Sequence, residues 1–206
     1  MGWGPGFNTP TKIRIIPAEG GSPIEPVAWP GWQGAPTWTP DGKGLIFGEN
    51  AGFYPIQPSC ALHYFDLGSA RTFSLPGTTG LWTARQSPKG RYIAAETRDQ
   101  QTLMLYDMRT RRAFKLLSFS DSRLGDNPAW SKDGKCIYID APLSPDPAIY
   151  GIRIPERAIE RVASLKGIQR ANQAMGEWIG IAPDGSPFLV RQVQASEIYA
   201  WDWAEP

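Results

Sequence analysis

The sequence has little of the chemistry from which most catalytic and metal sites are built. It contains one histidine, His63, and two cysteines, Cys60 and Cys136. A single imidazole excludes sites that need two histidine ligands, and two cysteines cannot form a disulfide scaffold or a zinc cluster. The sequence also lacks a Gly-x-Ser-x-Gly nucleophile motif, a phosphate-binding loop and a dinucleotide-binding fingerprint. We therefore expect no catalytic residues, no metal, no cofactor and no enzymatic activity.

A charge excess and long apolar runs are lacking as well. The 21 Lys and Arg residues nearly balance the 20 Asp and Glu residues, which leaves a net charge of +1. Nucleic acids and anionic membrane surfaces attract proteins with a basic excess, so neither is an expected partner. No apolar run approaches the roughly 18–20 residues that span a bilayer, so we expect no membrane insertion by this region.

The start of the chain, residues 1–10, has neither the basic stretch nor the apolar segment of a secretory signal. We expect the isolated chain to stay in the cytoplasm. A longer exported parent would instead carry this region to the periplasm or another extracytoplasmic compartment.

Glycine, proline and tryptophan are abundant. The chain has 22 Gly, 20 Pro and nine Trp, and 41% of its residues are apolar. This composition allows a sizeable core and many turns, and it stays below the combined Gly and Pro content of about 25–30% that marks disordered sequence. It favours a folded, turn-rich chain.

A repeat organises almost the whole chain. The residues before four shared glycines are spaced 48, 44 and 51 residues apart, at Asp41, Lys89, Asp133 and Asp184. A second motif, apolar and usually ending near an Asp, follows each of these turns. The turn segments are 36–47, 84–95, 128–139 and 180–190, and the second motifs are 62–67, 103–108, 149–154 and 198–203.

Each repeat predicts four short antiparallel strands. The Asp side chain of the turn can accept hydrogen bonds from nearby backbone N–H groups, and the Gly supplies the positive φ of a tight hairpin. Asp41, Asp133 and Asp184 are therefore interpreted as turn formers rather than catalytic acids. Segment 156–175 could also gather apolar residues on one helix face, but its place in the repeat favours a strand and a loop. Four strands per repeat of this length are typical of a β-propeller blade, so the fold class is all-β.

The stretches Trp38-Thr-Pro-Asp-Gly-Lys-Gly-Leu-Ile-Phe and Trp130-Ser-Lys-Asp-Gly-Lys-Cys-Ile-Tyr-Ile resemble the WD-repeat-like unit of TolB-like bacterial β-propellers. The resemblance covers roughly residues 12–203. This part of the chain is similar to the carboxyl-terminal blades of a larger propeller protein. Departures occur at Gln86 and Ile181, which replace the leading Trp, and at Lys89, which replaces the turn Asp. The resemblance implies an interaction or ligand-sensing module within a larger bacterial signalling or envelope protein.

We expect about four blades in an incomplete ring, preceded by an irregular segment over residues 1–11. TolB-like rings are expected to have more blades, so the open arc would expose sheet edges that favour self-association. The chain would then be either a truncated reading frame or a protein that closes its ring with another copy. The predicted boundaries are a half blade over 12–28, blades over 36–76, 84–118 and 128–165, and a partial blade over 179–203.

The candidate interaction site is one rim of the propeller. Loops between blades and loops between the second and third strands of a blade share that rim, and aromatic and Arg side chains make good contact anchors. A protein or peptide is the expected partner. For Trp82 and Trp178, packing between blades is the alternative. The candidate rim residues are Trp82, Arg85, Arg123, Asp126, Arg170 and Trp178.

Two further expectations concern polar residues outside that rim. His63 occupies an apolar strand position, so we expect a packed core histidine. The cluster of Arg109, Arg111, Arg112 and Lys115 lies on a hairpin of the opposite rim and is interpreted as a solvated face, with an acidic partner as the alternative.

An enzyme-associated propeller is the alternative function. It would be the substrate-gating fragment of a prolyl-oligopeptidase-type peptidase or part of a polysaccharide lyase.

Overall fold

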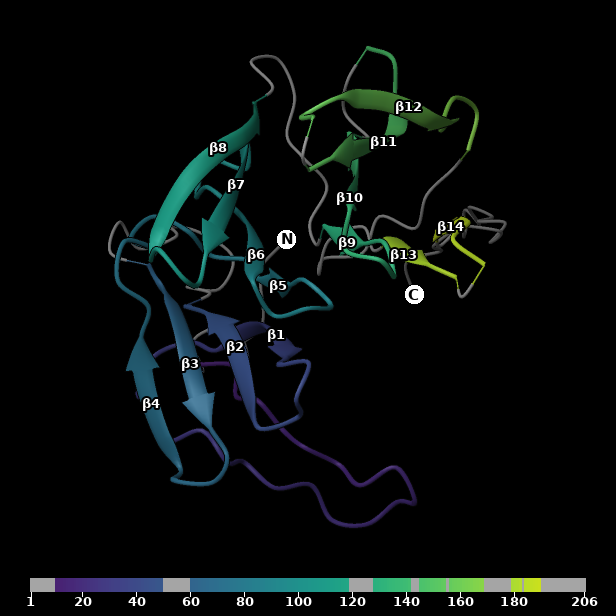
Figure 1. Cartoon of the computed structure of the whole chain (residues 1–206). Helices are drawn as coiled ribbons and strands as arrows, with labels where there is room; N and C mark the ends of the chain where they lie inside the picture. Colours follow the sequence, from purple (N-terminus) through teal and green to yellow (C-terminus); the bar gives the residue numbers. More distant parts are fainter. Residues whose placement is uncertain are drawn as a thin grey trace, which may run out of the picture.

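The computed structural model of the chain describes residues 10–49, 60–118, 128–141, 145–154, 156–168, 179–182 and 184–189. All regular structure in these residues is β, with three four-stranded antiparallel sheets and one hairpin (Figure 1). These residues include no helix, and hence none long and apolar enough to cross a membrane.

Each four-stranded sheet is built from consecutive strands. The first blade contains β1 (Gly34–Trp38), β2 (Gly44–Gly48), β3 (Leu62–Asp66) and β4 (Arg71–Ser74). The second contains β5 (Arg85–Gln86), β6 (Tyr92–Glu96), β7 (Thr102–Asp107) and β8 (Arg112–Ser118). The third contains β9 (Ala129–Trp130), β10 (Cys136–Ala141), β11 (Ala148–Arg153) and β12 (Ile159–Ser164), and the hairpin contains β13 (Ile179–Ile181) and β14 (Pro187–Leu189).

The first strands of successive blades lie next to one another. Strand β5 contacts both β1 and β9, and β9 also contacts β13, so these strands form the inner row of an arc. The last strands β4, β8 and β12 lie outside, and the arc formed by the described residues is open between β13–β14 and the N-terminal segment (Figure 1). The expected all-β propeller with an incomplete ring is confirmed.

The turn chemistry predicted from the repeat is also confirmed. Asp133 Oδ1 accepts hydrogen bonds from the Ser131 hydroxyl at 2.7 Å and from the Lys135 N–H at 3.0 Å, and these bonds lower the pKa of Asp133. Asp41 accepts the equivalent pair of bonds, from the Thr39 hydroxyl and the Lys43 N–H, whereas Asp184 accepts both of its bonds from Ser186, through the hydroxyl and the N–H. The following glycines, such as Gly134 with φ of 73°, adopt the positive φ that these turns require.

Apolar side chains pack between neighbouring blades rather than inside one sheet. Ile46 and Leu62 of the first blade pack against Ile93 and Tyr106 of the second. A second cluster joins the second and third blades, and a third joins the first blade to the N-terminal segment. Their buried members are Ala94, Leu103, Leu105, Ile137, Ile139 and Ile152, and Ile13, Val27, Leu45, Phe47 and Phe65.

The N-terminal half blade is less regular than the sequence predicts. A half blade was expected over 12–28, and in this range the structure has a single bridge, in which Ile15 and Ile24 exchange backbone hydrogen bonds of 2.9 and 3.0 Å. Next to it, the Ile13 N–H donates to the side-chain Oε1 of Gln33 at 2.8 Å rather than to a second strand. Prolines at 17, 23 and 26 remove backbone donors on both sides of the bridge, which explains the short pairing.

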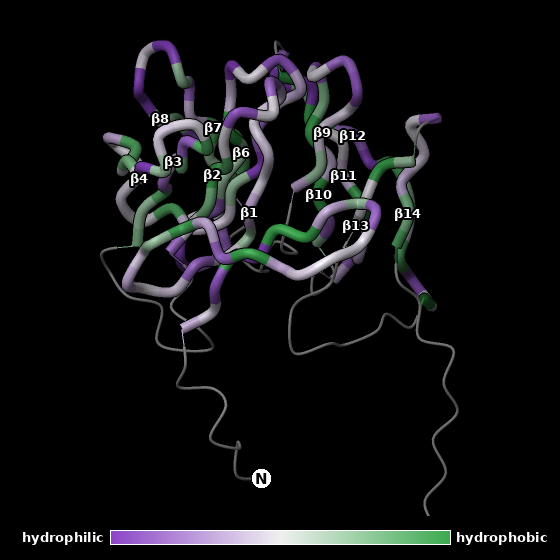
Figure 2. The backbone as a smooth tube through the Cα atoms, turned by 90° about the horizontal axis from the view of Figure 1, so that it is seen from below, coloured by the Kyte–Doolittle hydropathy of each residue, from purple (hydrophilic) through white to green (hydrophobic). Residues whose placement is uncertain are grey.

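In the described part of segment 156–175, for which a helix was the alternative, the chain forms a strand. Strand β12 (Ile159–Ser164) pairs antiparallel with β11, and Gly167 takes a φ of 73° in the turn that follows. Hydrophilic residues dominate the loops along the upper edge of Figure 2, whereas the strands are largely apolar. Residues 1–9 lie outside the described residues, and so does the whole of the predicted partial blade after Leu189.

Candidate interaction rim

Hydrogen bonds place three loops on one rim of the arc. The connection between the first and second blades passes through Gly80, whose N–H donates to the Cys60 carbonyl at 2.7 Å. The Gly80 carbonyl accepts from the Arg98 N–H at 3.0 Å. Cys60 leads into β3, and Arg98 lies in the turn between β6 and β7. The connection and the ends of the second and third strands therefore share the rim on which the sequence placed its candidate residues.

Of the candidate residues, Trp82 and Arg85 lie within the described chain. Trp82 is only 8% exposed, which fits the packing alternative more closely than a role as an exposed anchor. Arg85 is half-buried, and its Nη1 donates to the carbonyls of Ala35 at 3.1 Å and Ala84 at 2.8 Å. Arg85 thus ties β5 to the neighbouring β1. Arg123, Asp126, Arg170 and Trp178 lie outside the described residues, and their role at the rim stays a prediction.

Two buried acids at this rim were missed from the sequence. Glu96 ends β6 and Asp140 lies near the end of β10, and both are fully buried. The signal was present, because each acid is seven residues after the turn position, at Lys89 and Asp133 respectively. Acidic residues are ordinarily expected to be solvated, because burying a carboxylate is costly unless it interacts with other groups. Both side chains do take part in interactions within the chain.

Among the described residues, one exposed part of the rim is the turn between β6 and β7. Asp99 accepts hydrogen bonds from the Thr97 hydroxyl at 2.6 Å and the Gln101 N–H at 3.0 Å, and these bonds lower the pKa of Asp99. Arg98 and Asp99 are both exposed on this turn. The turn therefore presents a cation and an anion on a backbone that is fixed to the rest of the rim.

His63 lies below the same rim and is a packed core histidine, as predicted. Its ring is buried between aromatic rings, with centroid distances of 4.2 Å to Trp29 and 5.3 Å to Phe47. Its Nδ1 is 3.2 Å from the Ser74 hydroxyl, and its Nε2 is 3.1 Å from Glu49 Oε1. Burial lowers the pKa of His63, and the attraction of Glu49 offsets only part of that effect.

We expect stability to fall as the pH is lowered from about 7.5 to 5.5. The pKa of His63 in the folded chain lies below the ordinary value of 6.5, so below that pH the unfolded chain binds a proton that the folded chain resists. Urea denaturation across this range should show the loss in the native chain and little of it in His63→Gln, because His63 is the only histidine. An equal loss in His63→Gln would contradict the assignment.

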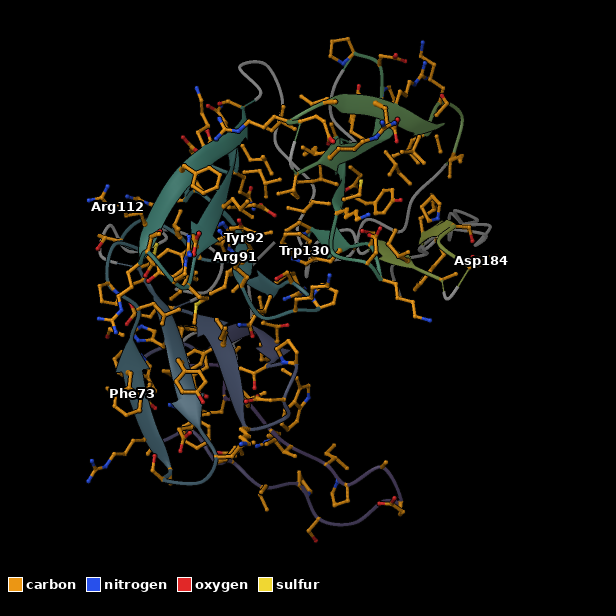
Figure 3. All side chains as sticks on the ribbon, viewed as in Figure 1. Phe73, Arg91, Tyr92, Arg112, Trp130 and Asp184 are labelled. Atoms are coloured by element: carbon orange, nitrogen blue, oxygen red, sulfur yellow. The ribbon has the colours of Figure 1, made fainter. Side chains whose placement is uncertain are left out.

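The opposite rim carries a groove between the third blade and the β13–β14 hairpin. Its volume is about 490 Å³, and charged turn residues of both signs line it, among them Lys135, Arg153, Asp133 and Asp184. Cys136 also lines it, but burial raises the pKa of its thiol, which disfavours the reactive thiolate. Figure 3 shows Asp184 at this end of the arc and Arg112, from the predicted solvated cluster, on the outer strand β8.

No group of three or more His, Cys, Asp or Glu side chains that could hold a metal ion occurs among the described residues. Cys60 and Cys136 are free thiols. Within this part of the chain, the side chains of the rim offer hydrogen bonds, charges and packed aromatic surface.

No protein-family model and no curated protein matches the chain. Solved structures do match. TolB from Acinetobacter baumannii is similar with a TM-score of 0.64 and 19% identity, over 90% of this chain and 44% of TolB. Oligogalacturonate lyase in complex with manganese is similar with a TM-score of 0.55 and 15% identity, over 75% of this chain and 44% of the lyase. Tricorn protease is similar with a TM-score of 0.55 and 12% identity, over 79% of this chain and 15% of the protease.

These similarities show the fold alone. The chain has a TolB-like β-propeller fold and spans less than half the length of TolB.

Proposed function

We propose that this TolB-like arc is a non-enzymatic recognition scaffold that binds a protein or peptide through the rim described above. We also propose that it works as part of a larger bacterial signalling or envelope protein. One observation carries the proposal: loops from successive blades are joined by hydrogen bonds at Gly80 into one rim, over strands whose side chains are packed between blades. A rigid base with charged side chains on fixed loops binds a partner without the cost of ordering those loops.

The residues whose types could take part in chemistry have structural roles in this chain, and this supports the same proposal. The turn aspartates bond to their own turns, His63 is packed between aromatic rings, and Arg85 spans two backbone carbonyls. Exposed charged groups that a partner can reach on this rim include Arg98 and Asp99. Charged rim groups set which partners are accepted and how fast they bind.

The rim is tested by selecting peptide ligands from a random displayed library against the native chain. We expect the selected peptides to bind Arg98→Glu at least about tenfold more weakly, which corresponds to about 1.4 kcal/mol. Arg112→Glu is the matched control, because Arg112 is equally a surface arginine but lies on outer strand β8. Fluorescence anisotropy of labelled peptides measures both affinities.

Two results would count against this proposal. Peptides that bind Arg98→Glu as tightly as the native chain would place recognition elsewhere. Reproducible turnover of oligogalacturonate with Mn²⁺, or of a proline-containing peptide, would favour the enzymatic alternative that the lyase and protease similarities raise.

A further inference from the structure

Each end of the arc exposes a residue whose equivalents in the other blades are covered by a neighbouring blade. Trp130 of β9 faces the second blade, and its indole Nε1 donates to the Arg85 carbonyl of β5 at 2.8 Å (Figure 3). Trp38 occupies the same position in β1, one residue before the hairpin turn. Its side chain is 52% exposed. Among the described residues, the preceding half blade has no inner strand to cover it, because only the Ile15–Ile24 bridge is formed.

The opposite end shows the complementary pattern. Ile46 of β2 pairs with Thr37, Ala94 of β6 pairs with Arg85, and Phe188 of β14 pairs with Gly180, so the three occupy one repeat position. Ile46 and Ala94 pack against the following blade and are fully buried. Phe188 keeps an interaction within its own chain, yet 44% of it is exposed.

We propose that a second copy of this chain covers these surfaces head to tail, with the β13–β14 hairpin of one copy packed against β1 of the next. The repeat gives the register of the contact. Gly180 occupies the position of Arg85, so its carbonyl is the acceptor for the Trp38 indole N–H of the other copy. The contact would repeat the one between β5 and β9, with Phe188 covered as Ile46 and Ala94 are.

A second copy fits because this chain carries both halves of the contact. The surface around Trp38 requires the inner strand of a propeller blade with a backbone carbonyl at the Arg85 position, and β13 is such a strand. The two surfaces differ, so the contact is heterologous and builds a closed ring or a longer array. The inference is independent of the proposed binding at the rim, since Trp38, Gly180 and Phe188 are not among the candidate rim residues.

The mass in solution tests the proposal. Multi-angle light scattering at micromolar concentration should give at least two copies of the 22.7 kDa chain. Trp38→Glu and Phe188→Glu should each lower the mass to one copy or weaken assembly at least tenfold. Phe73→Glu is the control, because Phe73 is 49% exposed but lies on the outer strand β4.

Mixing the two variants distinguishes this contact from any other association. Trp38→Glu retains an intact β13–β14 hairpin and Phe188→Glu retains an intact Trp38 surface, so an equimolar mixture should regain a two-copy complex. A native chain that stays at one copy throughout would overturn the proposal. So would an assembly that both substitutions leave intact, or a mixture of folded variants that remains single copies.

Discussion

Replacing Gly48 by alanine is expected to lower the free energy of unfolding by about 3 kcal/mol or more. A Cβ at this position would lie 1.5 Å from the Trp82 carbonyl oxygen and 2.6 Å from its carbonyl carbon. Both atoms belong to the backbone, so no side-chain rotation can relieve the clash. Strand β2 and the connection into the second blade would have to separate, which would also loosen the rim.

Gly68→Ala is the matched control for that substitution. The nearest atom to a Cβ at Gly68 is Asp66 Oδ1 at 3.5 Å, an ordinary contact distance. We expect its stability to change by less than about 0.5 kcal/mol in urea denaturation. A Gly48→Ala chain as stable as Gly68→Ala would contradict the close approach of Trp82 to β2.

Replacing Ile93 by alanine is expected to cost about 2–5 kcal/mol of unfolding free energy. Ile93 is fully buried in the cluster that joins the first two blades, where it packs with Ile46 and Leu62. Removing its side chain beyond Cβ would leave a cavity between two sheets, and neither sheet could close it without moving relative to the other. A loss of this size should lower the melting temperature by roughly 2–4 °C per kcal/mol.

Ile159→Ala controls for the loss of the same side chain from a strand. Ile159 lies on the outer strand β12 and is exposed, so its substitution should change stability by less than about 0.5 kcal/mol. Equal losses for Ile93→Ala and Ile159→Ala would mean that the blades are not packed together through this cluster.

The features that could be predicted from the sequence are those fixed by local chemistry. The Asp-Gly turns at Asp41, Asp133 and Asp184 recur because each needs an acceptor side chain and a positive φ, and both requirements are visible in the sequence. The same recurrence identified the strands on either side. It also correctly assigned the stretch around Ile159 to a strand, although its spacing allowed a helix.

The features that could not be predicted depend on contacts between distant segments. The Gln33 side chain accepts a hydrogen bond from the Ile13 N–H, which shortens the strand pairing of the half blade. Nothing in the local sequence indicates that interaction. Gly48 looks like any strand glycine until the Trp82 backbone is placed against it. At the rim, the sequence identified Trp82 by its residue type, but its burial depends on how the connection crosses between blades.

A crystal structure of this chain would decide whether successive sheets are arranged radially around a shared axis. We expect β5 and β9 side by side in the inner row, with the Trp130 indole N–H bonded to the Arg85 carbonyl. Two sheets stacked face to face, with Trp130 remote from Arg85, would contradict this radial arrangement.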